Sequence, residues 1–541
     1  MAEGGTELYD TTLRDGSQQK GMTLTVDEKL AVARLLDAVG VDYIEGGWPG
    51  AVPRDTEFFH RARTELGLRN ARLAAFGSTR RPGIAVPDDP QVRALLVSEA
   101  PVITLVGKSH TGHVERALHT TLAENLAMIG STVRHLVGAG RTVFLDAEHY
   151  FDGYRLNPNY ALEVVHTAAE AGARAVVLCD TNGGHLPDEV GRVVAETRAA
   201  TGAALGIHCH DDSGCAVANT LAATDAGAVH VQGTAHGYGE RCGNADLFTV
   251  IANLVLKRGR PVVTPDQLAA LTGTAAAVTA VTGVRPRAAA PYVGALAFTH
   301  KAGLHASALR VDPGLYQHTD PALLGNTMRT LVSDMGGRSS VALKARELGH
   351  DVAAGSEAAT RAAARVKHLE NLGYSFESAD ASFALLLHEE LGTEPAVPPF
   401  TVDTWQVTTA QGAAGPARSQ ATLHARVGTA DRTATGTGDT PVTALDAALR
   451  QLLTPGHPRL GRLVMTGHEI RALTSGDGPT TFRVLVSYRD GDRSWSTVGV
   501  GPDTLTATWQ AQLDAMRYAL LGEAPAETPG RPAPAASFAV A

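Results

Sequence analysis

The sequence is poor in several features that would each indicate a particular class of protein. It has only four cysteines in 541 residues, too few for the disulfide framework of small secreted domains. Basic residues are fewer than acidic ones: the chain has 47 Lys and Arg and 56 Asp and Glu, which gives a net charge of −9. This mildly acidic balance argues against a dedicated nucleic-acid-binding protein.

Long apolar runs are also missing. The N-terminus, MAEGGTELYDTTLRDG, lacks the basic and apolar regions of an export signal. The longest uncharged stretch, residues 267–284, consists mostly of Ala, Gly and Thr, and it is short and weakly apolar for a membrane span. We therefore expect a soluble, cytoplasmic protein. With 44% hydrophobic residues, the chain has ample material for folded cores.

A regular alternation runs through residues 7–255. Short runs rich in Val, Ile, Leu and Phe end in polar residues, and longer segments with helical spacing follow them. Eight such units in one stretch of this length predict a (β/α)₈ TIM barrel, and a doubly wound open sheet is the alternative. The predicted strands are 7–13, 42–45, 72–76, 102–106, 142–146, 173–179, 204–210 and 229–233.

The composition and the spacing of apolar residues divide the chain into further parts. After a catalytic barrel over residues 1–270, we predict helical linker subdomains over 271–392, because this part is rich in Ala and mainly helical in pattern. Residues 393–522 predict an α+β domain of regulatory type, with strands at 401–408, 421–427 and 482–488 and helices near 443–453 and 505–520. The tail, 523–541, is rich in Pro and Ala and is expected to be disordered.

The best candidate for a metal site is the pair His208 and His210 at the end of the seventh predicted strand. Side chains two residues apart on a strand point to one face, so both imidazoles can hold one ion. They could equally hydrogen-bond to loops only. Asp15, at the end of the first predicted strand, favours the metal, because closure of a barrel brings strands one and seven close together. Two imidazoles and a carboxylate suit a catalytic divalent cation.

Two further strand ends carry charge. Arg14 either forms a surface ion pair or stabilises charge on a substrate oxygen. Asp146 and Glu148 lie on one face of the fifth predicted strand and could serve a metal, proton transfer or a substrate hydroxyl, unless one of them pairs with Arg14. The four cysteines form no metal-binding pair and are expected to be packed as buried thiols.

Several motifs together resemble the acyl-CoA-dependent synthases that make 2-isopropylmalate, homocitrate and citramalate. The motifs are LYDTTLRDGSQ, YIEGGWPG, DAEHYFDGY, CDTNGG, HCHDDSG and GYGERCGNADL, and two of them are most similar to the citramalate synthase branch. The resemblance covers most of the chain, since STVGV and TWQAQLDAMRYAL are similar to the family's C-terminal regulatory domain.

The resemblance implies a role for each matching residue. The metal ligands would be Asp15, His208 and His210, with Asn244 in or near the coordination shell. The substrate-binding and catalytic residues would be Arg14, which stabilises the oxyanion, Gln18, Thr181, Glu148, and His305 with Tyr316. In this family the segment that carries His305 and Tyr316 usually reaches across a dimer interface, so a homodimer is implied.

The implied reaction is a metal-dependent Claisen condensation of acetyl-CoA with a 2-oxo acid, with pyruvate giving citramalate as the leading case. The cation would be Zn²⁺, Mn²⁺ or Mg²⁺, and the proton-removing base is either Glu148 or His305 with Tyr316. The C-terminal domain could bind an amino-acid effector such as isoleucine or leucine. An aldol lyase on the same barrel is the alternative class of enzyme, and a scaffold without catalysis is a third possibility.

Three histidines depart from the citramalate-type motifs. His110, His185 and His236 stand in GKSHTGHV, DTNGGHLP and AHGYGERCG, where that branch usually has other residues. Neutral variation in loops is one interpretation. The other is a pocket for a bulkier or more anionic 2-oxo acid than pyruvate, such as one with a phosphonate group.

Overall fold

The protein is described by a computed structural model over residues 5–392, 400–411, 415–473 and 480–521. The chain forms two compact units. The first contains the described residues up to Phe298 together with Gln317–Met328, and the second contains Thr299–Tyr316 and the described residues from Arg329 onward. The tail predicted to be disordered lies outside the described residues.

Eight parallel strands of the first unit close into a barrel. Each strand pairs with the next along the chain, and β1 also pairs with β8, with Glu7 opposite His230 and Asp10 opposite Gly233. The prediction of a (β/α)₈ barrel is therefore confirmed, and the open sheet is excluded. The strands are β1 (Glu7–Asp10), β2 (Tyr43–Glu45), β3 (Arg72–Ser78), β4 (Val102–Lys108), β5 (Thr142–Glu148), β6 (Ala175–Asp180), β7 (Leu205–Cys209) and β8 (His230–Gly233).

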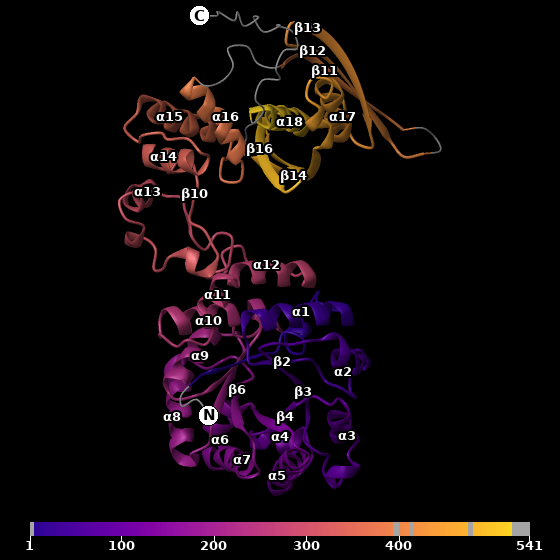
Figure 1. Ribbon diagram of the computed structural model, residues 1–541, viewed down its shortest axis with the longest axis vertical. Coiled ribbons are helices and arrows are strands. Elements are labelled where there is room, and N and C mark those ends of the chain that lie inside the picture. The colour runs from indigo at the N-terminus through magenta and orange to yellow at the C-terminus, as the bar shows by residue number, and fades with distance from the viewer. Residues whose placement is uncertain (1–4, 393–399, 412–414, 474–479, 522–541) are drawn as a thin grey trace, which may run out of the picture. The chain divides into compact units, whose positions relative to one another are not determined.

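Helices surround the barrel because each has one apolar face to bury against the strands. The first begins at a capping box of Thr25 with Glu28 and ends at Gly40, whose φ of 94° stops the helix. Figure 1 shows the helices outside the strands. They are α1 (Val26–Val39), α2 (Pro53–Glu65), α3 (Pro90–Val97), α5 (Leu122–Gly138), α7 (Pro158–Glu170), α8 (Pro187–Thr201), α9 (Ala216–Asp225) and α10 (Leu247–Leu256), and α11 (Pro265–Ala269) and α12 (Leu271–Thr282) follow them.

The first strand is shorter than predicted. It ends at Asp10 rather than at residue 13, because the side chain of Asp10 accepts a hydrogen bond from the backbone N–H of Thr12 and starts a turn. The carbonyl of Thr11 then accepts hydrogen bonds from the N–H groups of Arg14 and Gly16. Arg14 and Asp15 therefore lie in a turn that follows the strand, not on the strand itself.

The second unit contains helices and two antiparallel sheets. The helices α13 (Gly303–Leu309), α14 (Arg338–Glu347), α15 (Glu357–Asn371) and α16 (Asp380–Leu391) confirm that the segment after the barrel is mainly helical. The sheets have the orders β11-β12-β13 and β14-β15-β16. Their elements are β11 (Phe400–Ala410), β12 (Arg418–Val427), β13 (Ala430–Gly438), α17 (Pro441–Leu453), β14 (Val464–Leu473), β15 (Thr481–Asp490), β16 (Arg493–Gly501) and α18 (Thr504–Leu521).

These sheets confirm the predicted α+β domain, although β13, β14 and β16 were not among its predicted strands. One core of buried side chains joins α17 and α18 to both sheets. Throughout the described ranges, no helix combines the length and the hydropathy that crossing a bilayer requires.

Candidate active site

Asp15, His208 and His210 come together at one end of the barrel. Asp15 Oδ2 lies 3.4 Å from His208 Nε2 and 3.8 Å from His210 Nε2. One potential ligand atom from each residue lies within 4.8 Å of the others. All three side chains are buried. Their arrangement can hold a divalent cation, and in the part of the chain that the structure describes it is the one group of this kind.

The loop after β8 has the shape that this cluster needs. Asn244 forms an isolated bridge with His210, and this bridge joins the loop to the end of β7. A side chain at Gly243, where φ is 91°, would lie 2.0 Å from the carbonyl oxygen of Gly237. A side chain at Gly239 would lie 2.3 Å from Asn244 Nδ2. Glycine at these positions therefore allows the loop to bring Asn244 next to the two histidines.

The donor atoms fit a cation. Asn244 Nδ2 donates to the carbonyl of Tyr238 over 2.9 Å and lies 3.3 Å from Asp15 Oδ1, whereas the buried Asn244 Oδ1 has no hydrogen-bond partner among the described residues. An amide oxygen without a partner is costly to bury unless a ligand occupies it. Imidazole nitrogens with carboxylate and amide oxygens accept several divalent metals, so the donor set does not choose one.

The protonation states also suit a cation. Burial favours the neutral acid of Asp15, but the Arg14 guanidinium and the two imidazoles hold its pKa well below its ordinary value. Burial, reinforced by the neighbouring His208, lowers the pKa of His210 to about 4. Burial alone would lower the pKa of His208, but its hydrogen bond to Asp15 and the negative charge of Asp15 raise it. At neutral pH the site therefore offers an ionised carboxylate and a neutral His210, and a cation that binds would displace a proton from His208.

Arg14 is held in place by the buried carboxylate of Glu45. Its Nε donates to Glu45 Oε1 over 2.5 Å, its Nη1 lies 3.3 Å from Asp15 Oδ2, and its Cζ lies 3.9 Å from the centre of the Phe76 ring. Glu45 is 0% exposed and also accepts hydrogen bonds from Tyr9 and Thr11. The alternative of a surface ion pair between Arg14 and Asp15 is wrong, because these two side chains are only 13% and 6% exposed.

The two carboxylates of β5 have separate partners, and neither pairs with Arg14. Glu148 pairs with Lys108, at the end of the neighbouring β4. Asp146 accepts a hydrogen bond from Gln232 Nε2 over 2.9 Å. Burial, with the negative charge of Glu45 adding to it, raises the pKa of Asp146 to about 7. The pairing of one of these carboxylates with Arg14, an alternative from the sequence, is therefore wrong.

The remaining candidates occupy three places. Thr181, just after β6, accepts a hydrogen bond from the His149 N–H over 2.8 Å. Gln18, in the short helix η1 (Gly16–Gln18), lines a cavity of about 570 Å³ with its neighbours and residues 239–243. His305 and Tyr316 belong to the second unit, where their rings lie 4.1 Å apart.

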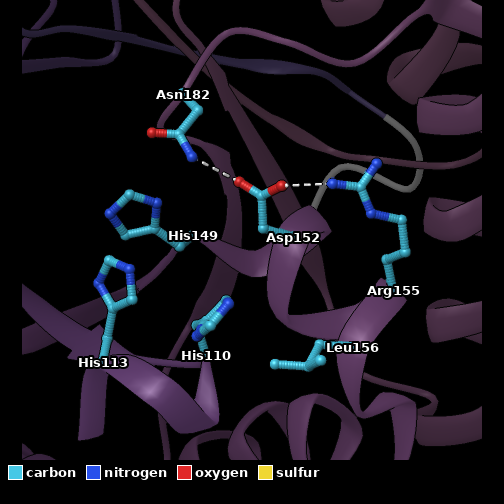
Figure 2. A pocket seen from close by; sticks show the side chains of 7 residues that line it. All are labelled: His110, His113, His149, Asp152, Arg155, Leu156 and Asn182. Carbon is cyan, nitrogen blue, oxygen red and sulfur yellow. Dashed lines mark hydrogen bonds and ion pairs between the residues drawn. The ribbon is translucent and has the colours of Figure 1, made fainter. Parts of the chain in front are cut away.

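A second cavity, of about 360 Å³, lies beside the end of β5 and is shown in Figure 2. The rings of His110, His113 and His149 form one side of it, with ring centres 4.7 and 4.1 Å apart. On the other side, Asp152 accepts hydrogen bonds from Asn182 and Arg155. His149 has a φ of 55°, a strained backbone conformation for a residue other than glycine.

Only one of the three unusual histidines lines this cavity. The ring of His185 is directed at Asp180, with 2.9 Å between Nδ1 and Oδ1, and the residue is 3% exposed. His236 Nε2 lies 2.8 Å from the carbonyl oxygen of Ala275 in α12. His185 and His236 are thus committed to protein contacts, whereas His110 belongs to the cavity of Figure 2.

Glu45, Gln232 and Lys108 were not predicted as site residues. Each lies at or near the end of a barrel strand, in β2, β8 and β4 respectively. The rule that barrel enzymes place functional groups at the carboxyl ends of their strands would have found Glu45 and Lys108. Gln232 lies one residue before the end of β8, and its contact with His208 depends on the register between β7 and β8.

Comparison with known proteins finds similarity along nearly the whole chain. Family profiles described as HMGL-like, homocitrate synthase post-HMGL domain-like and LeuA allosteric (dimerisation) domain match residues 6–278, 292–373 and 377–520 respectively. A protein of Streptomyces coelicolor named (R)-citramalate synthase is 54% identical over 96% of this chain and 98% of its own length. Proteins of the same name from Synechocystis and Aquifex aeolicus are 44% and 42% identical, each over 95% of this chain and 96% and 97% of their own lengths.

Proposed function

This chain belongs to the family of (R)-citramalate synthases, and from this premise we propose that it condenses acetyl-CoA with pyruvate to give citramalate and CoA. The relatives named (R)-citramalate synthase support the reaction. The single observation that carries the proposal is the approach of Asp15 Oδ2 to within 3.4 and 3.8 Å of the two imidazoles, beside the guanidinium of Arg14. A 2-oxo acid needs a cation and a fixed positive charge of this kind next to its carbonyl.

The metal ligands in this proposal are Asp15, His208 and His210, with Asn244 offering its free Oδ1 as a further donor. When bound, the cation would act as a Lewis acid that makes the ketone carbon of the 2-oxo acid more electrophilic. Arg14 would hold the oxygen that gains negative charge, and its bond to Glu45 keeps the guanidinium in place for that task. Gln18 and Thr181 would line the site for the substrate.

Glu148 is proposed as the group that takes a proton from the methyl group of acetyl-CoA. The methyl carbon then forms a bond to the ketone carbon of pyruvate, whose oxygen becomes the alkoxide held by Arg14. Water cleaves the thioester and releases CoA as a thiol. Support for Glu148 comes from its position at the end of β5. Arg14 is bonded to Glu45 and Gln232 to Asp146, whereas Glu148 pairs with Lys108 and is not needed to orient either of those side chains. His305 with Tyr316 stands as the other candidate base, and a Glu148→Gln variant separates the two.

A specialised 2-oxo acid is not favoured over pyruvate. Two of the three histidines on which that alternative depends, His185 and His236, make their contacts with protein groups. An aldol lyase is not favoured either, because the relatives named as synthases match this chain over nearly its full length, including the C-terminal domain.

The C-terminal part of this proposal concerns assembly and control. The profile named for allostery and dimerisation supports a homodimer, with 377–520 as the assembling part. We propose an amino-acid end product such as isoleucine or leucine as its effector. The three profile ranges agree with a division into three parts, with breaks at residues 278–292 and 373–377, so the second boundary that we propose moves from residue 392 to about residue 375. Light scattering should give a mass of about twice 56.4 kDa.

The test of the function is product analysis. The purified protein is incubated with acetyl-CoA and each member of a panel of 2-oxo acids, free thiol is measured, and products are identified by mass spectrometry. We expect thiol release and citramalate with pyruvate, and much lower rates with bulkier acids. Removing bound metal with a chelator should stop turnover, and adding back Zn²⁺, Mn²⁺ or Mg²⁺ separately should identify the cation. A preference for another acid, or turnover without thiol release, would overturn the proposal.

A further inference from the structure

Three buried side chains form a hydrogen-bonded row that ends at the candidate metal ligand His208. Asp146 Oδ1 accepts from Gln232 Nε2 over 2.9 Å, and Gln232 Oε1 lies 2.9 Å from His208 Nδ1. Gln232 is 0% exposed. Strands β5 and β8 are not neighbours in the barrel, so the bond between Asp146 and Gln232 crosses the interior. The row therefore joins β5, β8 and β7.

The chemistry of the row decides which way the amide of Gln232 faces. In its ionised form Asp146 only accepts hydrogen bonds, so Oδ1 then takes the amide nitrogen of Gln232 on its side, which is the arrangement in the structure. The amide oxygen then faces His208, and only a protonated Nδ1 can donate to it. A neutral imidazole has one protonated nitrogen, so Nε2 keeps its lone pair. Nε2 is the atom that lies 3.4 Å from Asp15.

We propose that Gln232 is a positioning residue that fixes the tautomer of His208, so that Nε2 is the nitrogen offered to the cation, and that Asp146 in turn fixes Gln232. The inference rests on the proposed metal site. With the amide reversed, its NH₂ group would require an unprotonated Nδ1, and Nε2 would carry the proton and could not bind metal. His210 has no such partner, because its Nδ1 is without a hydrogen bond among the described residues. The row thus acts on one ligand of the pair.

A purely structural role for Gln232 makes a different prediction. If the amide only fills space and satisfies its neighbours, any side chain of similar size would leave metal binding unchanged once the protein folds. If it fixes the tautomer, the replacement must keep an acceptor opposite Nδ1. Glutamate keeps that acceptor when its other oxygen shares one proton with Asp146, and methionine keeps none, although both have nearly the volume of glutamine.

The test measures the affinity of the metal-free protein for Zn²⁺ by competition with a chromophoric chelator, together with the visible absorption spectrum of the Co²⁺-loaded protein. Loss of an outer hydrogen-bond partner of a ligating histidine weakens metal binding by about 10–100-fold. We therefore expect Gln232→Met to bind Zn²⁺ at least about tenfold more weakly, with a changed Co²⁺ spectrum. Gln232→Glu should keep an affinity and a spectrum close to those of the wild type. Gln512→Met is the matched control, because Gln512 is equally buried and bonds to a carbonyl in the other unit.

A second variant keeps the test decisive if Gln232→Met does not fold. Asp146→Asn lets the Gln232 amide take either direction, so it too should weaken Zn²⁺ binding and alter the Co²⁺ spectrum. Wild-type affinity and spectrum in either folded variant would overturn the inference while leaving the proposed function intact. A wild-type protein that binds neither Zn²⁺ nor Co²⁺ would instead refute the metal site itself.

Discussion

Arg14→Ala should affect both folding and catalysis, and the two effects can be separated. Arg14 is the cation that faces Glu45, whose carboxylate is fully buried. After the substitution, its side-chain partners within the described ranges are the hydroxyl groups of Tyr9 and Thr11. Removing one partner of a buried ion pair costs about 3–5 kcal/mol, because the other charge stays buried without compensation. Removing a group that stabilises a developing oxyanion lowers kcat by about 10²–10³.

A double variant distinguishes the folding cost from the catalytic one. Arg14→Met with Glu45→Gln removes both charges and keeps side chains of similar volume. Its stability should recover most of the loss, because a neutral pair of similar volume in place of a buried ion pair is often neutral or stabilising. Its kcat should stay as low as that of Arg14→Ala, because the guanidinium that holds the substrate oxygen is missing in both variants. Arg14→Lys should be intermediate, since a point charge cannot serve Glu45, Asp15 and substrate together.

The assays are urea unfolding of the metal-free proteins and thiol release with acetyl-CoA and pyruvate. Working without metal keeps the stability comparison independent of changes in cation binding. Equal stability of Arg14→Ala and the wild type would refute the role of the buried pair. High activity in Arg14→Ala or in the double variant would refute the assignment of Arg14 to the oxyanion.

Three further predictions concern the same end of the barrel. Glu148→Gln should lower kcat by about 10²–10⁴ with unchanged Zn²⁺ affinity, and an unchanged kcat would instead favour His305 and Tyr316 as the base. Burial lowers the pKa of His149 to about 4. Since the unfolded chain takes up this proton at higher pH, stability should fall as the pH drops from about 6.5 to 4, and thermal unfolding of His149→Gln should show a smaller fall. The expectation of four buried thiols is wrong for Cys215, which is half-buried, and for Cys242, which is exposed. Maleimide should label Cys242 fastest for this reason, and fast labelling in a Cys242→Ser variant would contradict it.

The barrel was predictable because its evidence is local and repeated. Each strand is a short apolar run and each helix has its own spacing and end signals, so eight units could be counted without knowing any contact between them. The end of β1 was not predictable in this way. Thr11 and Thr12 suit a strand by composition, but the side chain of Asp10 bonds to the N–H of Thr12 and turns the chain.

The missed strands of the C-terminal domain have a different cause. β13 has few apolar residues, because Gly436 and Gly438 face the helix α17 at very close range. A side chain at Gly436 would lie 2.2 Å from the backbone nitrogen of Ala448. Gly499 in β16 is in the same position, since a side chain there would lie 2.0 Å from the carbonyl oxygen of Ala507 in α18. These glycines are therefore strand residues against which helices pack.

The site was predictable only where one residue at a strand end could act alone. His208, His210 and Asp15 carry their chemistry in their own side chains, and barrel closure is enough to bring them together. Glu45 and Gln232 act through Arg14 and His208, and neither has a sequence pattern of its own. Their contacts depend on the register between neighbouring strands. For example, Tyr9 of β1 lies opposite Gln232 of β8.

The end of the barrel also contains buried acidic side chains that are not among the candidate metal ligands. Glu45 and Asp146 lie in the same interior, and each is bonded to a group that must keep one orientation, the Arg14 guanidinium in one case and the Gln232 amide in the other. A buried acceptor is costly unless it is satisfied, so each carboxylate holds its donor strongly in place. Rigid orientation of this kind lowers the cost of arranging charges during the reaction. In the function proposed above, both buried acids therefore act by orienting another group, the Arg14 guanidinium for Glu45 and the Gln232 amide for Asp146.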